Sequence, residues 1–291
     1  MNGRRDGDNR CRIRIVPGGC WRAIQVVAIA FLLIGLCESA SAERQRTFSI
    51  SWGADALVRQ DLLYGPNIAN GFALINADVR IESRREHAIG DVEISFDLFR
   101  LASHEPYDYL FQGDTYSLTR SPFTFVAVSA GHHRFVGNSS LALGAAIASD
   151  IEAGNWIFGQ AGIFSYHAYF SVESSALYEL DFGDGSKLIL GVRLPLAGWL
   201  SRSPFALADD TYIQAIESHN GVITFFTLVA AGRLTAIHHL QRVRLSATLH
   251  SPLTERLSVR ATYRGEAQHI ADIREQISYR HGLDLGISYD F

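Results

Sequence analysis

Charged side chains recur at alternate positions in several apolar segments of the sequence. Examples are Asp78 and Arg80 in DVRIE, and Arg242 and Arg244 in RVRLS. Alternate spacing places side chains on one face of a β-strand. Several such faces around a polar interior would either guide a small polar solute or form ion pairs with one another. Strand parity assigns ten charged residues to this interior: Asp55, Arg59, Asp78, Arg80, Glu93, Asp97, Arg242, Arg244, Arg260 and Arg264.

Serine hydrolysis is the other chemistry to consider. A catalytic serine needs a histidine within hydrogen-bonding reach, and the histidine needs an amide or carboxylate partner. The nearest approaches are GHHRFVGNSS, with His132, His133 and Ser139, and ESHNG, with Ser218 and His219. We expect both segments to be loops, where histidines are more often solvated than catalytic. The sequence has no phosphate-binding glycine loop and no zinc-ligand pattern, so we expect neither a cofactor nor a metal.

The elements that would position these residues are β-strands. In GLDLGISYDF, the last ten residues, Leu283, Leu285, Ile287, Tyr289 and Phe291 fall on one face, and Gly, Asp and Ser fall on the other. This is the pattern of a strand with one apolar face. The same alternation is clear at 47–58, 73–82, 91–98, 176–182, 187–196, 242–250 and 257–265, and less regular at 123–130, 141–149 and 155–170.

Turn signals such as GDGS (183–186) and SPLTE (251–255) separate neighbouring segments. The segment 225–240 is either an apolar strand or a helical turn, and we expect loops at 197–221 and 271–282. The count is about twelve strands, between ten and fourteen, in one all-β domain.

The first residues resemble an export signal. An arginine-rich stretch precedes the apolar run Val26 to Leu36, and Ala40 and Ala42 form a small-residue cleavage site. We therefore expect residues 1–42 to be a signal peptide cleaved after Ala42, and residues 43–291 to be a single domain; an uncleaved anchor is the alternative. All three cysteines, Cys11, Cys20 and Cys37, lie in the part to be removed.

The charge of residues 43–291 argues against a nucleic-acid partner. Residues 1–42 contain six of the 26 basic and three of the 30 acidic residues, so 20 Lys and Arg remain against 27 Asp and Glu. A domain that binds nucleic acid would need a basic tract or an excess of positive charge. The absence of cysteine after residue 42 also removes disulfides and thiolate metal sites.

The composition of the two strand faces favours a transmembrane barrel over a soluble one. The polar face carries Arg, Asp, Ser, Thr and Gly in place of the Lys and Glu of a solvated surface. Aromatic residues such as Tyr178, Phe182, Tyr263 and Tyr289 fall toward strand ends, where membrane girdles would lie. We expect an antiparallel up-and-down barrel with its apolar face on lipid and its polar face lining the lumen. A periplasmic or secreted soluble β-protein is the alternative.

The last strand resembles the assembly signal of Gram-negative outer-membrane β-barrels. The resemblance is carried by Leu283, Leu285, Ile287, Tyr289 and Phe291. It implies an outer-membrane location, contact with outer-membrane lipid, and recognition of this strand by the barrel-assembly machinery. The last strand would pair with the first, which would bring the acids of the early strands to the arginines of the late ones.

Three functions fit such a barrel. The first and preferred one is a narrow channel or transport-type protein for a small polar solute, since about twelve strands leave little room inside. The second is an outer-membrane lipid hydrolase of the phospholipase or lipid A deacylase type. Those families place His and Ser two residues apart on a strand, and the pattern His-x-Ser occurs at none of the eleven histidines here. The third is a structural or adhesive barrel with a plugged lumen and functional extracellular loops.

Overall fold

The computed structural model describes residues 45–103, 108–111, 114–117, 120–158, 161–203 and 220–291. The expected signal peptide, residues 1–42, lies outside these ranges, as do Ser218 and His219 of the second hydrolase candidate. Within the described ranges, no helix combines the length and hydropathy needed to cross a bilayer.

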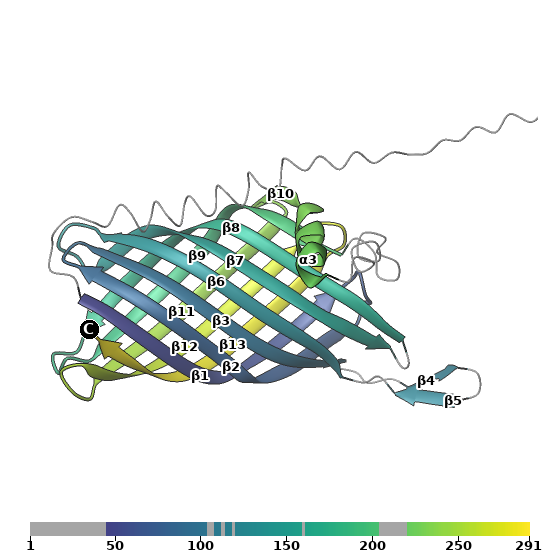
Figure 1. Cartoon of the computed structure of the whole chain (residues 1–291), viewed down its shortest axis with the longest axis horizontal. Helices are drawn as coiled ribbons and strands as arrows, with labels where there is room; N and C mark the ends of the chain where they lie inside the picture. Colours follow the sequence, from purple (N-terminus) through teal and green to yellow (C-terminus); the bar gives the residue numbers. More distant parts are fainter. Residues whose placement is uncertain (1–44, 104–107, 112–113, 118–119, 159–160, 204–219) are drawn as a thin grey trace, which may run out of the picture. The chain divides into compact units, whose positions relative to one another are not determined.

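Ten long antiparallel strands close into a barrel (Figure 1). Around the wall their order is β9-β11-β12-β13-β1-β2-β3-β6-β7-β8, and β8 pairs again with β9. The strands are β1 (Gln45–Asp61), β2 (Ile68–Arg85), β3 (Ala88–Ser103), β6 (Ser121–Phe135), β7 (Leu141–Phe158), β8 (Ala161–Asp181), β9 (Lys187–Arg202), β11 (Leu240–Pro252), β12 (Leu257–Ile270) and β13 (Gln276–Asp290).

The expected count of about twelve strands is therefore too high for the barrel. The three segments 141–149, 155–170 and 176–182 belong to only two strands, because β7 has 18 residues and β8 has 21. The segment 225–240 contains no barrel-length strand. Its first part belongs to the helix α3 (Gly221–Ala230), and its second part contains the four-residue strand β10 (Arg233–Ala236).

Two small additions accompany the barrel. Strand β10 pairs with the last part of β9, and α3 also contacts β9, where the Trp199 indole donates to the Val229 carbonyl at 2.8 Å. Strands β4 (Asp108–Phe111) and β5 (Asp114–Ser117) form a separate two-stranded sheet. Part of the loop expected at 197–221 is thus strand, and residues 204–219 lie outside the described ranges.

The apolar faces of the strands point outward and the polar faces inward. In β13, the five residues Leu283, Leu285, Ile287, Tyr289 and Phe291 that end the chain are 44–61% exposed, whereas the intervening Asp284 is 1% exposed. This is the inverse of a soluble barrel, and the outer wall needs lipid to cover it. Tyr178, Phe182 and Tyr289 lie near strand ends as expected, but Tyr263 lies in the middle of β12.

The first and last strands close the barrel, as the alternation in the last strand predicts. Their register runs from Thr47 opposite Asp290 to Asp61 opposite Gln276. Glycine makes this seam possible, because Gly282 lies opposite Asp55 and a Cβ at Gly282 would lie 1.9 Å from the Asp55 carboxylate.

The two ends of the barrel differ in their connections. Short turns at 86–87, 136–140, 182–186 and 253–256 join strands at the end where β1 begins and β13 ends, which we call the short-turn end. The longer connections, such as those between β3 and β6 and between β9 and β11, lie at the opposite, long-loop end. The loop between β12 and β13 covers only 271–275; residues 276–282, expected to be loop, belong to β13.

Candidate functional site in the barrel lumen

All ten charged residues assigned to the interior lie on inward strand faces. Strand β1 shows how the sequence achieves this, since Asp55 and Arg59 are buried at 1% and 4% exposure while Trp52 and Val58 are exposed on the other face. The inward residues of different strands meet across the lumen in ion-paired groups, four of which are described in turn. Whether they line a conducting pore stays a prediction.

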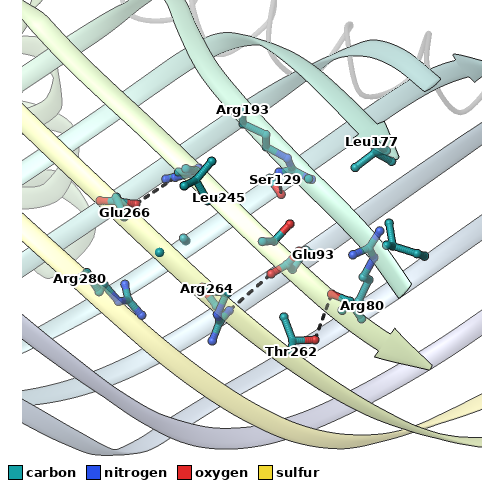
Figure 2. Close-up of a pocket in the computed structure, with 18 of the residues that line it drawn as sticks. Arg80, Glu93, Ser129, Leu177, Arg193, Leu245, Thr262, Arg264, Glu266 and Arg280 are labelled. Atoms are coloured by element: carbon teal, nitrogen blue, oxygen red, sulfur yellow. Dashed lines mark hydrogen bonds and ion pairs between the residues drawn. The ribbon is translucent and has the colours of Figure 1, made fainter. Parts of the chain in front are cut away.

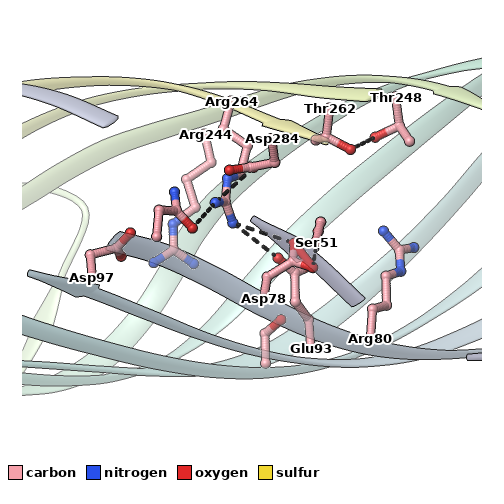
Figure 3. Close-up of polar contacts among 12 residues, drawn as sticks. Ser51, Asp78, Arg80, Glu93, Asp97, Arg244, Thr248, Thr262, Arg264 and Asp284 are labelled. Carbon is pink, nitrogen blue, oxygen red and sulfur yellow. Dashed lines mark hydrogen bonds and ion pairs between the residues drawn. The ribbon is translucent and has the colours of Figure 1, made fainter. Parts of the chain in front are cut away.

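The Arg264 group joins the early acids to a late arginine (Figure 3). The Arg264 guanidinium lies 2.8 Å from Asp284, 3.6 Å from Glu93 and 3.8 Å from Asp78. Ser51 donates a hydrogen bond to Asp78 at 2.5 Å. One guanidinium from β12 thus faces carboxylates on β2, β3 and β13, which is the acid-to-arginine arrangement that the sequence predicts for the seam.

The Arg280 group lies next to the seam on β13. The Arg280 Nε donates to Asp55 at 2.6 Å, and Nη2 donates to Asp97 at 2.5 Å. The guanidinium carbon also lies 5.5 Å from the centre of the Phe99 ring and 5.8 Å from that of Phe125. Sequence reasoning missed Arg280 because it assigned this part of the chain to a loop, although its parity matches that of Asp284.

The Arg242 group joins Arg242 and Arg244 of β11 to acids of β7, β8 and β12; of these residues, Figure 2 labels Glu266 of β12. Arg242 pairs with Asp150 and with Glu266, both at 2.7 Å. Arg244 pairs with the same two acids at 2.5 and 3.1 Å, and with Glu173 at 3.4 Å. The sequence pattern identified the two arginines but missed the three acids. The alternation of β7 and β8, which hold Asp150 and Glu173, is weak, and Glu266 of β12 lies just beyond the segment 257–265.

A fourth set of pairs lies toward the long-loop end. Arg59 is bidentate on Glu152, with the longer contact at 2.7 Å, and both side chains are less than 8% exposed. Arg202 pairs with Asp61 and donates to the Arg274 carbonyl at 2.6 Å. Arg202 was missed because the end of β9 was assigned to the loop expected at 197–221; a register shift between β8 and β9 also changes the inward parity there.

An aromatic cluster fills the lumen beside these pairs. Phe99, Phe123 and Trp156 are at most 9% exposed and pack with Leu57 and Leu101, and Tyr64 and Phe125 cover them. The Phe123 and Trp156 rings meet edge to face with centroids 5.0 Å apart, and the Tyr64 ring stacks on Trp156 at 5.7 Å. Apolar side chains inside a polar lumen leave no room for a hydrated path at this level.

Two sizeable cavities lie between the Arg59–Glu152 pair and the short-turn end of the barrel. The central cavity, of about 150 Å³, lies among the Arg242 and Arg264 groups. The mouth cavity, of about 210 Å³, lies at the short-turn end and is lined by Thr47, Lys187 and Asp290 among others. Arg80, His250 and Arg260 line both cavities, so the two adjoin. A third cavity, beside Arg59 and Glu152, measures only about 30 Å³.

The hydrolase candidates are not brought together. His132 and His133 lie on β6 and not on a loop; His132 faces outward and His133 is buried in the lumen. The His133 Nε2 lies 2.8 Å from Ser175 Oγ, and its Nδ1 lies 3.8 Å from Asp91. Ser139 lies in the following turn and donates to the Val136 carbonyl at 2.7 Å. The buried Ser175 and His133 therefore face away from the lipid that a lipid hydrolase would act on.

Neither the pairs nor the outer wall offers a metal centre. Among the residues that the structure describes, no group of three or more His, Cys, Asp or Glu side chains is arranged to hold a metal ion. Carboxylates are numerous in the lumen, but arginines are their partners.

Comparisons with known proteins give the fold and not the activity. No protein-family model and no curated protein matches the sequence. The outer-membrane protease OmpT from Escherichia coli has a similar structure, with a TM-score of 0.50 and 6% identity over 87% of this chain and 99% of that one. The translocator domain of the autotransporter NalP from Neisseria meningitidis has a TM-score of 0.46 and 9% identity, covering 94% and 96%. An outer-membrane channel from Pseudomonas putida F1 has a TM-score of 0.37 and 9% identity, covering 87% and 98%.

The chain therefore has the fold of the Gram-negative outer-membrane β-barrels, as the resemblance of its last strand implies. Its apolar outer wall agrees with a location in that membrane. A structural likeness at 6% identity gives the fold alone, so the activity has to be argued from the lumen.

Proposed function

We propose that this protein is a membrane-anchored barrel with a closed lumen, and that its long-loop end is the surface available to partners. The observation that carries the proposal is the aromatic cluster around Phe123 and Trp156, which lies across the lumen beside the Arg59–Glu152 pair. A packed apolar layer excludes water, and paired charges offer a passing ion no free ligand.

The periplasm is the compartment at the short-turn end, because outer-membrane barrels have short periplasmic turns and longer extracellular loops. The aromatic cluster then blocks the extracellular half of the lumen, while the mouth cavity opens toward the periplasm. Cell-surface partners would meet the connections between β3 and β6 and between β9 and β11.

A narrow channel for a small polar solute, which the sequence favours, is the second candidate. The specific observation in its favour is that the central and mouth cavities adjoin through Arg80, His250 and Arg260. Such a channel would have to move the aromatic cluster in order to conduct. A lipid hydrolase has less support, because the buried pair of His133 and Ser175 lies inside the lumen.

Single-channel recording in a planar bilayer tests the closed lumen. The wild-type barrel should insert and show no discrete conductance steps. The double variant Phe123→Ala, Trp156→Ala removes two rings of the cluster and should produce small steps, because water can then reach the ion pairs. Insertion is checked separately by the slower mobility of unheated samples in gel electrophoresis.

The matched control is Trp52→Ala, Phe72→Ala, which removes two outward-facing rings that are 56% and 71% exposed. This control should stay silent like the wild type. Regular steps from inserted wild-type protein would reject the closed lumen and make the narrow channel the better proposal.

A further inference from the structure

We propose that the periplasmic end of the lumen holds a binding site for a small tetrahedral oxyanion, phosphate or sulfate, centred on Arg260. The site lies where the mouth cavity and the central cavity adjoin, and Arg80, His250 and Arg260 line both. It adds a ligand to the closed-lumen barrel and does not depend on whether the barrel conducts.

A row of basic side chains defines one wall of the site. Lys187 of β9 lies opposite His250 of β11 in the strand register, and His250 lies opposite Arg260 of β12. All three line the mouth cavity. The next position in the row is Gly286 of β13, which has no side chain to offer a counter-charge. Lys187 and Arg260 carry positive charges on either side of the His250 imidazole, so the row favours a negative charge beside it.

Arg260 is the least compensated member of this row. Its side chain is 3% exposed, and its contact with Asp78 is 3.8 Å, which is too long for a hydrogen bond. The Nε donates to Thr262 at 3.0 Å, but among the described residues Nη1 has no hydrogen-bond partner. Burying a partly compensated guanidinium is costly, and an oxyanion in the cavity beside it would offset that cost.

The acids that line the mouth cavity do not supply the missing charge. Glu82 pairs with Arg80 at 3.1 Å, and Asp290 accepts a hydrogen bond from Thr47 at 2.5 Å. Among the described residues, Asp78 at 3.8 Å is the only carboxylate within ion-pairing distance of Arg260, and Arg264 shares it, so the Arg260 charge is only partly compensated. Arg80, across the cavity, provides a second guanidinium for the same ligand.

Neutral donors and the cavity size favour a tetrahedral oxyanion. The hydroxyls of Ser49 and Ser258 line the mouth cavity, and hydroxyl and guanidinium groups are both donors to phosphate or sulfate oxygens. A volume of about 210 Å³ holds such an ion with several waters. The aromatic cluster lies at the other end of the lumen, so the ligand would enter from the periplasm.

Calorimetric titration of the full chain, expressed in a Gram-negative host and extracted from membranes in detergent, tests the site. Sodium phosphate, sodium sulfate and glycerol 3-phosphate are titrated separately at constant chloride. We expect saturable phosphate binding to the wild type, and at least tenfold weaker binding to Arg260→Gln. Arg256→Gln is the matched control, since Arg256 is exposed on a turn at the same end and its loss changes the net charge equally.

The Arg260→Gln variant should fold, because it removes a buried charge that lacks a close partner. Its unfolding midpoint without phosphate should be at least that of the wild type, and added phosphate should raise the midpoint of the wild type alone. Binding of phosphate without glycerol 3-phosphate would assign the site to the free ion, and binding of both would assign it to the phosphate group. No saturable binding to the wild type, or equal binding to Arg260→Gln, would overturn the proposal.

Discussion

At the scale of single residues, the lumen shows how a small barrel can bury many charges. Each arginine of the Arg242 and Arg280 groups lies within 2.5–2.7 Å of at least one carboxylate. Desolvation makes such charges costly one by one, and pairing with good geometry offsets the cost without adding much net stability. Removing one partner of a buried pair should therefore lower the free energy of unfolding far more than removing both partners.

The Arg59–Glu152 pair is the sharpest place to test this asymmetry. Glu152→Gln leaves the Arg59 guanidinium buried beside Phe123 and Phe125 without a counter-charge. We expect it to lower the free energy of unfolding by about 3–5 kcal/mol. Unfolding of the barrel in micelles by guanidinium chloride, followed by tryptophan fluorescence, measures the change.

Two companion variants make the result specific. Arg59→Met combined with Glu152→Leu should recover most of the loss, because it removes both charges and extends the aromatic cluster. Glu275→Gln breaks an ion pair with His269 whose side chains are 34% and 50% exposed, and should change the midpoint little. Equal effects of Glu152→Gln and Glu275→Gln would show that burial does not control the value of these pairs.

At the scale of the element, strand parity is reliable until a bulge interrupts it. In β2 the register shifts between Phe72 and Ile75, so the inward positions are odd-numbered before the shift and even-numbered after it. Asp78 and Arg80 follow the shift and share one parity, which is why the alternation of 73–82 identified them. No local sequence signal revealed the comparable shift between β8 and β9, and the end of β9, with Arg202, was assigned to a loop.

The seam between β1 and β13 also requires open space at the inward position opposite Asp55. The inward position opposite Asp55 is Gly282, and any side chain there would overlap the carboxylate that binds Arg280. Gly282→Ala should therefore destabilise the folded barrel by about 1–3 kcal/mol through overpacking. The unfolding midpoint measures this effect.

Gly265→Ala on β12 is the matched control for the seam. A Cβ at Gly265 would lie 3.7 Å from Tyr263, which is ordinary contact. The control also replaces a strand glycine by alanine, so it carries the same gain in strand propensity and the same loss of chain freedom. If Gly265→Ala and Gly282→Ala destabilise equally, the tight fit at Asp55 is not the cause.

At the scale of the whole molecule, the sequence predicts the class of fold better than the number of strands in the barrel. The inverted alternation and the last strand predict a transmembrane barrel, and the structure closes β13 on β1. The strand count failed where single strands are long and buried residues are consecutive, as from Ser165 to Tyr169 in β8. The partners of Arg242 and Arg244 on β7 and β8 could not be predicted either, because these strands are far from β11 in the sequence and meet it only after closure.

Phe291 allows assembly in the cell and stability of the folded barrel to be tested separately. The Phe291 backbone amide donates to the Arg46 carbonyl at 2.9 Å, and the Phe291 side chain is 60% exposed at the short-turn end. Deleting Phe291 removes one hydrogen bond, worth about 1 kcal/mol, so the refolded barrel should unfold at nearly the wild-type midpoint. The amount of folded barrel in the outer membrane of living cells should nevertheless fall severalfold if the assembly machinery reads this residue.

Phe48→Ala distinguishes recognition of Phe291 by the assembly machinery from anchoring of an aromatic ring at the lipid boundary. Phe48 lies on β1 opposite Tyr289, faces outward and is 39% exposed at the same end of the barrel. Aromatic side chains in such a belt stabilise a barrel wherever they stand in the chain. Assembly in cells should therefore be little changed by Phe48→Ala and reduced by the loss of Phe291. Equal losses in both variants would assign Phe291 to the aromatic belt alone, and would leave the assembly signal to Leu283, Leu285, Ile287 and Tyr289.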